Sequence, residues 1–286
     1  MRIVSIVDNG IEHPGLVDPQ RGVVVIEDLV SSPIPDAMVL LSEFARFSAL
    51  ADGAPDDVFR PYDSVSFGPP YRRPRKIWGI GLNYVEHAGD LSAEIPVEPA
   101  SFIKGDHTII GPDDAIILPT QSSRVTAEAE LGLVIGQFCR NVEESEALDY
   151  VWGLCCILDQ TAEDILQRNP RFLTRSKNFP TFFSFGPEIV PFREVVPYGS
   201  QIGDLKVSTV KNGVVERSNL VGNMIFSPAT LVSFHSKVMP LFPGDIISTG
   251  TPGAVVIEEG DVVECRIEGL PTLRNRVELG STHAAQ

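Results

Sequence analysis

Short apolar runs separated by glycine and proline make up most of the chain after residue 76. They read IWGIGL, AIILP, LGLVIG, GLCCIL, GDIISTG and DVVECRIEGL. Many short strands with few long helical patterns predict a mainly β body, a sandwich or barrel-like roll to which helices are attached. We expect helices over residues 143–151, 161–168 and 228–237, the last with Ser227 as N-cap and Pro228 at its first position.

The first 70 residues have a different pattern. Residues 2–10 and 22–29 read as short strands, and residues 35–52 have the periodicity of an amphipathic helix. The expected apolar stripe of this helix consists of Met38, Leu41, Phe44, Ala45 and Leu50. Residues 67–76, rich in proline and arginine, form a candidate linker. The sequence therefore predicts an α+β, mainly β protein with a small α/β N-terminal domain over 1–70 and a larger, mainly β domain over 71–286.

The segment RVTAEAELGLVIG, residues 124–136, combines like charges with strand alternation. In a strand, Glu128 and Glu130 share one face with Gly132, while the residues between them form an apolar face. The acidic face is nearly bare beyond the glutamates, which predicts a strand that leaves a core and enters a cleft. Two carboxylates this close repel each other, so they need a counter-charge.

A third carboxylate follows the next buried run. Residues 154–158, LCCIL, read as a strand buried on both faces, and Asp159 comes at its end just before the helix expected from Thr161. Glu128, Glu130 and Asp159 could converge as oxygen ligands, a set that favours magnesium or manganese over zinc. From spacing alone, a solvated acidic patch or an aspartate that caps the helix stays open as the alternative.

Composition narrows the classes of partner. The 286 residues include 23 basic and 38 acidic residues, a net charge of −15, which disfavours nucleic acid and anionic membranes and favours a small-molecule ligand. No apolar stretch reaches the length of a membrane span, and Asp8 interrupts the N-terminal apolar segment, so we expect a cytoplasmic protein. The four cysteines have no zinc-site spacing, and their pattern indicates no disulfide framework.

The order of several motifs resembles the fumarylacetoacetate hydrolase superfamily. They are IGLNYVEHAGDL, PASFIKGDHTIIGP, AEAELGLVIG, CILDQTAED, SKNFPTFFSFGPEIV and FPGDIISTGTPGAV. The resemblance spans residues 76–255 and implies a mixed β-roll, a homodimer and one divalent metal ion held by Glu128, Glu130 and Asp159. The ion implied is Mg²⁺, with Mn²⁺ as a possible substitute.

Further site residues follow from the same resemblance. His87 and Asp90 match a lid segment in which a histidine and an acidic residue activate water. Lys177, expected to be catalytic, and Lys104 match lysines near the ligand that bind a substrate oxygen or steady the acidic cluster. The turn STGTPG resembles the one that closes the pocket, and in it Gly250 allows close backbone approach. Thr251 of the same turn offers a hydroxyl to the substrate.

One position departs from the family pattern. Glu163 stands where relatives commonly have an arginine that grips a substrate carboxylate. This change reverses a charge, because a glutamate repels an anionic ligand that an arginine would bind. Arg168, Arg171 or Arg175 could compensate from the adjacent segment.

The resemblance implies an enzyme. The first hypothesis is a magnesium-dependent hydrolase that cleaves a carbon–carbon bond of a 1,3-dicarbonyl substrate, such as an acylpyruvate or diketo acid, through a metal-bound enolate. His87, oriented by Asp90, would take a proton from the attacking water. A β-keto acid decarboxylase or an enol–keto isomerase on the same metal site is the alternative. A non-catalytic ligand-binding homologue is the third hypothesis, and the clustered carboxylates argue against it.

Overall fold

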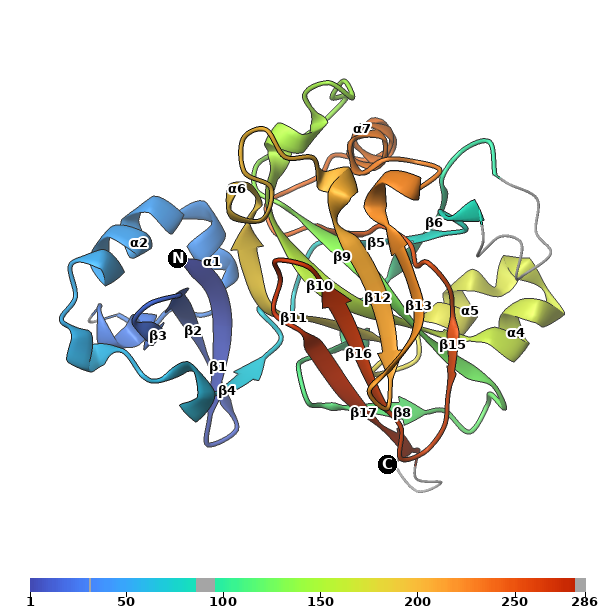
Figure 1. The fold of residues 1–286 in the computed structure, drawn as a ribbon, viewed down its shortest axis with the longest axis horizontal. Coiled ribbons are helices and arrows are strands. Elements are labelled where there is room, and N and C mark those ends of the chain that lie inside the picture. Colours follow the sequence, from blue (N-terminus) through green and yellow to red (C-terminus); the bar gives the residue numbers. More distant parts are fainter. Residues whose placement is uncertain (31, 86–95, 281–286) are drawn as a thin grey trace.

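A computed structural model describes residues 1–30, 32–85 and 96–280, and its strands form two sheets (Figure 1). The larger is 12-stranded, and its continuous path runs β3 (Gly22–Val25), β2 (Ile11–Asp18), β1 (Arg2–Asp8), β11 (Phe183–Pro191), β10 (Val151–Ala162), β9 (Val125–Ile135), β14 (Ile246–Ser248), β5 (Ile77–Gly81) and β6 (Ala100–Lys104). Three short strands pair beside this path: β4 (Ser66–Gly68) with β1, β7 (Ile109–Ile110) with β11 and β15 (Val255–Ile257) with β9.

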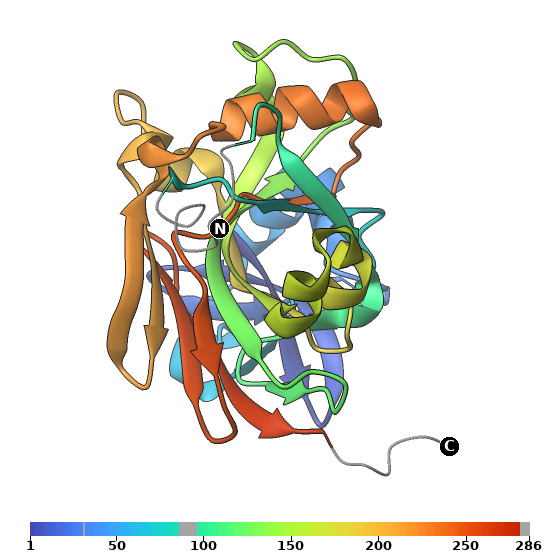
Figure 2. The ribbon, with the colours of Figure 1, turned by 90° about the vertical axis from the view of Figure 1, so that its right-hand side faces the viewer.

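The second sheet is 5-stranded and packs against the larger one (Figure 2). Its order is β13 (Val214–Leu220), β12 (Lys206–Lys211), β16 (Val262–Ile267), β17 (Leu273–Leu279) and β8 (Ala115–Leu118). Antiparallel and parallel pairs occur in both sheets, and neither closes into a barrel within the described residues. The mainly β, mixed-sheet fold that the sequence predicts is thus confirmed.

The main hydrophobic core lies between the two sheets. It joins Leu131 of β9 and Leu154 of β10 to Val207 of β12 and Val263 of β16, all fully buried. Short helices surround the sheets (Figure 1), and none in the described part of the chain is long and apolar enough to span a bilayer. They are α1 (Met38–Ser42), α2 (Phe44–Asp52), α4 (Glu163–Arg168), α5 (Leu173–Lys177), α6 (Phe192–Val195) and α7 (Pro228–Val238).

The N-terminal residues extend the larger sheet. Strand β1 pairs with β2 along one edge, and along the other edge it pairs with β4 and, at Ile3 and Ile189, with β11. The proline- and arginine-rich segment that follows β4 is anchored on the body, since the buried Tyr71 donates its hydroxyl to the carbonyl of Gly244 at 2.9 Å. It is therefore packed, and the domain boundary at residue 70 stays a prediction.

The helix expected over residues 35–52 is interrupted at Glu43, where φ −117° and ψ 24° separate α1 from α2. The break changes which face is buried. Leu40, Leu41, Phe47 and Ala51 lie in the core, whereas Ala45 and Leu50 are exposed. The predicted apolar stripe was wrong at these two positions because it assumed one continuous helix.

Two other helix predictions need correction, and one is confirmed. Residues 143–151 contain only a short 3₁₀ turn at Ala147–Tyr150 before β10 begins. Helix α4 begins at Glu163, two residues later than expected, because Thr161 still pairs with Thr126 of β9. Helix α7 begins at Pro228, and the Ser227 hydroxyl accepts a hydrogen bond from the Thr230 amide at 3.1 Å, as the N-cap pattern predicts.

Strand β9 is buried along its whole length, so the positions beyond the glutamates are packed in a core, and the expectation that the acidic end faces a cleft stays a prediction. Its bare positions are filled by neighbours. A Cβ at Gly132 would lie 2.6 Å from Cys155 Sγ and 2.6 Å from Ile157 Cδ1. Beyond them, Val134 packs with residues of the N-terminal helices in a second core. Glycine in this strand therefore allows close packing beneath the N-terminal residues.

We expect Gly132→Ala to lower the free energy of unfolding by about 1–3 kcal/mol, because the added methyl overpacks this contact. Urea denaturation of the purified variant measures the loss. Gly53→Ala is the matched control, since Gly53 has an ordinary φ of −83° and its Cβ would be 3.6 Å from the nearest atom. Equal stability of Gly132→Ala and wild type would contradict this account of β9.

Candidate metal and active site

Three carboxylates meet where β9 and β10 run side by side. Asp159 pairs directly with Glu128, and Glu130 pairs with Ile157 one step along the ladder. Residues paired across a ladder project to the same face, so all three side chains point away from the second sheet. Their oxygen atoms lie within 4.8 Å of one another, and all three residues are buried. The structure therefore brings together the three acidic residues that the sequence singles out.

Two lysine side chains supply positive charge at this cluster. Lys177, at the end of α5, places Nζ 2.9 Å from Glu128 Oε2 and 2.8 Å from Asp159 Oδ2. Lys104, at the end of β6, places Nζ 2.5 Å from Asp159 Oδ1 and also donates to the carbonyl of Lys177. The side chain of Lys177 is 6% exposed and that of Lys104 is 0% exposed. The counter-charge that the paired glutamates require is thus partly built into the protein.

Hydroxyl groups orient the two glutamates. Glu128 Oε1 accepts hydrogen bonds from Thr161 Oγ1 at 2.6 Å and Thr126 Oγ1 at 3.2 Å. Glu130 Oε2 accepts from Ser248 Oγ at 2.6 Å. Sequence reasoning missed these hydroxyls as site residues. Thr126 and Thr161 carry a signal that could have found them, because each lies two positions from a carboxylate on the same strand face.

The turn after β14 supplies a backbone hydrogen-bond donor to the carboxylate cluster. The Gly250 amide donates to Glu130 Oε2 at 2.8 Å. Gly250 has φ +98°, and a Cβ there would lie 2.7 Å from Asn83 Cβ, so only glycine fits this approach. Thr251 Oγ1 is bonded inside the turn, to the carbonyl and amide of Gly253. The substrate-binding roles of Lys104, Gly250 and Thr251 stay predictions.

Burial and charge shift the pKa values of these groups. Burial, and next the charge of Asp159, raise the pKa of Glu130 to about 8. Burial lowers the pKa of Lys104 against the opposing effect of Asp159. Burial would also lower the pKa of Lys177, but Asp159 and Glu128 outweigh it and raise the pKa above its ordinary value. Lys177 therefore stays charged near neutral pH and cannot serve readily as a base.

The position that departs from the family pattern has its own partner. The carboxylate of Glu163 forms an ion pair with Arg124 Nε, and the Glu163 amide donates to the Arg124 carbonyl at 2.9 Å. Arg168 is instead paired with Asp164, and Arg175 donates weakly to Gln121 Oε1 at 3.4 Å. Arg124 was missed by sequence reasoning, which looked for a compensating charge only in the segment after Glu163.

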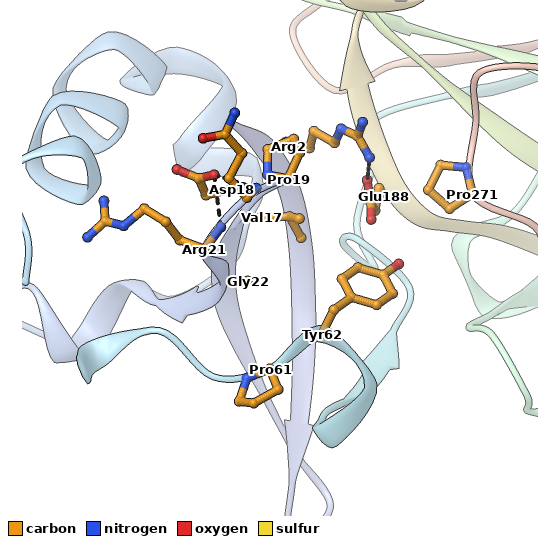
Figure 3. A pocket seen from close by; sticks show the side chains of 11 residues that line it. Arg2, Val17, Asp18, Pro19, Arg21, Gly22, Pro61, Tyr62, Glu188 and Pro271 are labelled. Carbon is orange, nitrogen blue, oxygen red and sulfur yellow. Dashed lines mark hydrogen bonds and ion pairs between the residues drawn. The ribbon is translucent and has the colours of Figure 1, made fainter. Parts of the chain in front are cut away.

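The proposed lid pair, His87 and Asp90, lies outside the described residues, so its geometry stays a prediction. A separate cavity of about 500 Å³ lies beside β1 and β2 (Figure 3). Arg2 and Glu188 form an ion pair of 2.9 Å at its wall, and Asp18 accepts a hydrogen bond from the Arg21 amide. None of the three carboxylates lines this cavity.

Comparison with known proteins adds independent information. Residues 76–278 match the family model described as fumarylacetoacetate (FAA) hydrolase C-terminal. The oxaloacetate tautomerase Fahd2a of rat mitochondria is 32% identical over 97% of this chain and 91% of its own. The structure of a maleylpyruvate hydrolase from Sphingobium sp. SYK-6, solved with manganese(II) and pyruvate, has a TM-score of 0.81 at 25% identity and covers 98% of this chain and 100% of its own.

A third relative carries another reaction. The structure of a 2-hydroxyhepta-2,4-diene-1,7-dioate isomerase from Mycobacterium marinum has a TM-score of 0.74 at 29% identity. It covers 99% of this chain and 100% of its own. Proteins similar to this chain over nearly their full length are thus named for tautomerase, hydrolase and isomerase activities.

We expect Lys177→Gln to lower the free energy of unfolding by about 3–5 kcal/mol at pH 8, because it removes the ammonium shared by two buried carboxylates. The loss shrinks at pH 5, where Glu130, whose pKa in the folded state is raised to about 8, holds a proton and the negative charge that Lys177 offsets is smaller. Chemical denaturation at both pH values measures it. Lys237→Gln, which breaks an exposed ion pair with Glu143, is the control and costs less than about 1 kcal/mol. A loss that does not depend on pH would contradict this role of Lys177.

Proposed function

The chain belongs to the fumarylacetoacetate hydrolase family, and we propose that it interconverts the enol and keto forms of a 2-oxo dicarboxylate with a divalent cation bound. The members of this family that are similar to the chain are enzymes. The observation that carries the proposal is the buried cluster of Glu128, Glu130 and Asp159, which Lys104 and Lys177 contact within the described residues. A tautomerase activity is also the one named for the rat relative.

The residues present fit a hard divalent cation. The donor set consists of oxygen atoms alone, as Mg²⁺ and Mn²⁺ prefer. Among the described residues, three carboxylates and two ammonium groups leave one formal negative charge in a buried place when Glu130 is ionised, and burial raises the pKa of Glu130 to about 8. A bound divalent cation would complete the compensation. Mg²⁺ or Mn²⁺ is therefore our proposed cofactor.

When bound, the cation would act as a Lewis acid on the oxygens of a dicarbonyl ligand and stabilise its enolate. The side chains have separate tasks. Ser248 and the Gly250 amide fix Glu130, and Thr161 fixes Glu128, so the donors are oriented before a ligand arrives. Lys177, which stays charged, adds positive potential where negative charge develops on the substrate.

Proton transfer needs a further group, because Lys177 is held in its charged form. We assign this task to His87, with Asp90 orienting the imidazole, as the motif resemblance implies. A histidine titrates near neutral pH and can both take and return a proton at a substrate carbon. Lys104 has no exposed side-chain surface and instead holds Asp159.

Carbon–carbon bond hydrolysis is the second candidate function. The similarity to the maleylpyruvate hydrolase of Sphingobium, which covers almost all of this chain, favours this reaction. It would use the same carboxylates and the same His87–Asp90 pair, but with a water molecule as nucleophile. Homodimer assembly and a cytoplasmic location stay predictions.

We expect the Kd for Mn²⁺ to rise as the pH falls below about 8, by up to about tenfold per pH unit, because Glu130 must release its proton to bind a cation. Electron paramagnetic resonance titration of free Mn²⁺ measures it. Asp159→Asn weakens binding at every pH, whereas Asp149→Asn, at an exposed position, leaves it unchanged. Wild-type affinity in Asp159→Asn would refute the metal site.

We also expect the protein with Mg²⁺ to accelerate the loss of enol absorbance of oxaloacetate beyond Mg²⁺ alone, without carbon–carbon cleavage. His87→Ala lowers this rate by about 10²–10⁴-fold, the usual contribution of a positioned acid–base group. His13→Ala, at a half-buried histidine of β2, is the control. Product analysis separates the candidates, since two carbonyl fragments from an acylpyruvate would favour the hydrolase and carbon dioxide release would favour a decarboxylase.

A further inference from the structure

The polar face of β9 and β10 continues beyond the three carboxylates as a ladder of paired side chains. Asp159 lies opposite Glu128, and Thr161 lies opposite Thr126. One position past the paired Val125 and Ala162, where β9 begins and β10 ends, the Glu163 amide bonds to the Arg124 carbonyl, so this pair comes next after the two threonines. Every second residue of a strand shares a face. The ladder therefore leads from a buried acidic cluster, across two hydroxyls, to a guanidinium.

The ladder becomes more exposed along its length. Thr126 and Thr161 are buried, the side chain of Glu163 is 11% exposed, and that of Arg124 is 50% exposed. Arg124 thus lies at the boundary with solvent on the face that carries the carboxylates. A guanidinium has five N–H donors, so the contact of Nε with Glu163 does not exhaust it. The contact leaves it able to make a paired hydrogen bond to a carboxylate.

The spacing suits a short dicarboxylate. Glu128 lies four positions after Arg124, about 13 Å along a strand at ~3.3 Å per residue. The Glu128 side chain extends into this interval, since its Oε1 accepts a hydrogen bond from Thr126 Oγ1. A 2-oxo acid whose dicarbonyl end lies at the carboxylate cluster would direct a second carboxylate along the ladder towards Arg124.

The ion pair is not needed to attach α4 to β9. Asp164 already joins α4 to the segment that precedes β9, since it accepts hydrogen bonds from Ser122 Oγ at 2.5 Å and from Ser123 Oγ at 3.4 Å. If the Arg124–Glu163 ion pair served only to hold α4 in place, it would duplicate these contacts. An arginine held at one edge by a mostly buried glutamate is instead suited to recognition, because its guanidinium is oriented before a ligand arrives.

We propose that Arg124 determines specificity by binding the distal carboxylate of a 2-oxo dicarboxylate, and that Glu163 is a positioning residue that orients its guanidinium. The inference rests on the proposed function for the location of the dicarbonyl end. It does not depend on which reaction the enzyme performs. Glu163, whose negative charge would by itself repel such a substrate, becomes part of the recognition through its partner.

The first test compares two substrates on the Mg²⁺-loaded enzyme: oxaloacetate and its 4-ethyl ester, which lacks the distal charge. Arg124→Gln raises KM for oxaloacetate by about tenfold to a hundredfold, as expected when a charged hydrogen bond is lost, with kcat within about twofold. Its KM for the ester does not change. Arg168→Gln is the matched control, an exposed arginine paired with a carboxylate of the same helix, and it changes neither KM.

The role of Glu163 has its own readout. Glu163→Gln raises KM for oxaloacetate by a smaller factor than Arg124→Gln, and Glu163→Asp, which keeps the charge, recovers part of the loss. Both variants keep the wild-type KM for the ester. A parallel fall of kcat and kcat/KM for both substrates, or an unchanged KM for oxaloacetate in Arg124→Gln, would overturn the proposal.

A binding measurement separates this proposal from the proposed reaction. Calorimetric titration of the Mn²⁺-loaded protein compares 2-oxoglutarate with 2-oxobutyrate, which differ in the distal carboxylate. We expect wild type to prefer 2-oxoglutarate and Arg124→Gln to lose that preference. Equal affinity of wild type for both ligands would refute the role of Arg124. Absence of tautomerase turnover with the preference intact would refute only the proposed reaction.

Discussion

The structure of the site depends on the electrostatic balance between three buried carboxylates and two buried ammonium groups. Like charges within 4.8 Å of one another are costly away from water, and the cost is offset only where cationic partners meet them directly. Lys177 spans Glu128 and Asp159, and Lys104 holds the other oxygen of Asp159. Glu130 is the member that no ammonium contacts in the described structure, and its pKa is raised accordingly.

The fold provides this balance by bringing together charged side chains from four elements. The carboxylates come from β9 and β10, the lysines from the ends of α5 and β6, and the Gly250 amide from the turn after β14. All of these elements pack on the central part of the larger sheet, whose opposite face is closed by the second sheet. Gly132 of β9 leaves room for Cys155 and Ile157, which pack with the N-terminal residues over the remainder of this face.

The sequence predicted the mainly β fold because strand patterns are local signals. The convergence of the three acidic residues was left open by their spacing and was implied by the family resemblance. The sequence did not predict that β10 continues past Asp159, since Thr161 and Ala162 gain their strand conformation from pairing with β9. The break at Glu43 and the full burial of β9 also depend on distant contacts. The same holds for the Ser248 contact, which joins residues 118 positions apart in the sequence.

The position of Glu163 shows why a residue cannot be interpreted by its own charge alone. In sequence, a glutamate in place of an arginine reverses the charge and argues against an anionic ligand. In the fold, antiparallel pairing sets Arg124 beside it, so the two charges cancel and a guanidinium remains on the same face of the site. The pairing register of β9 and β10 therefore decides the local charge, and that register is fixed by the buried core between the sheets. Substrate charge selectivity in this protein is, on this view, a consequence of strand pairing.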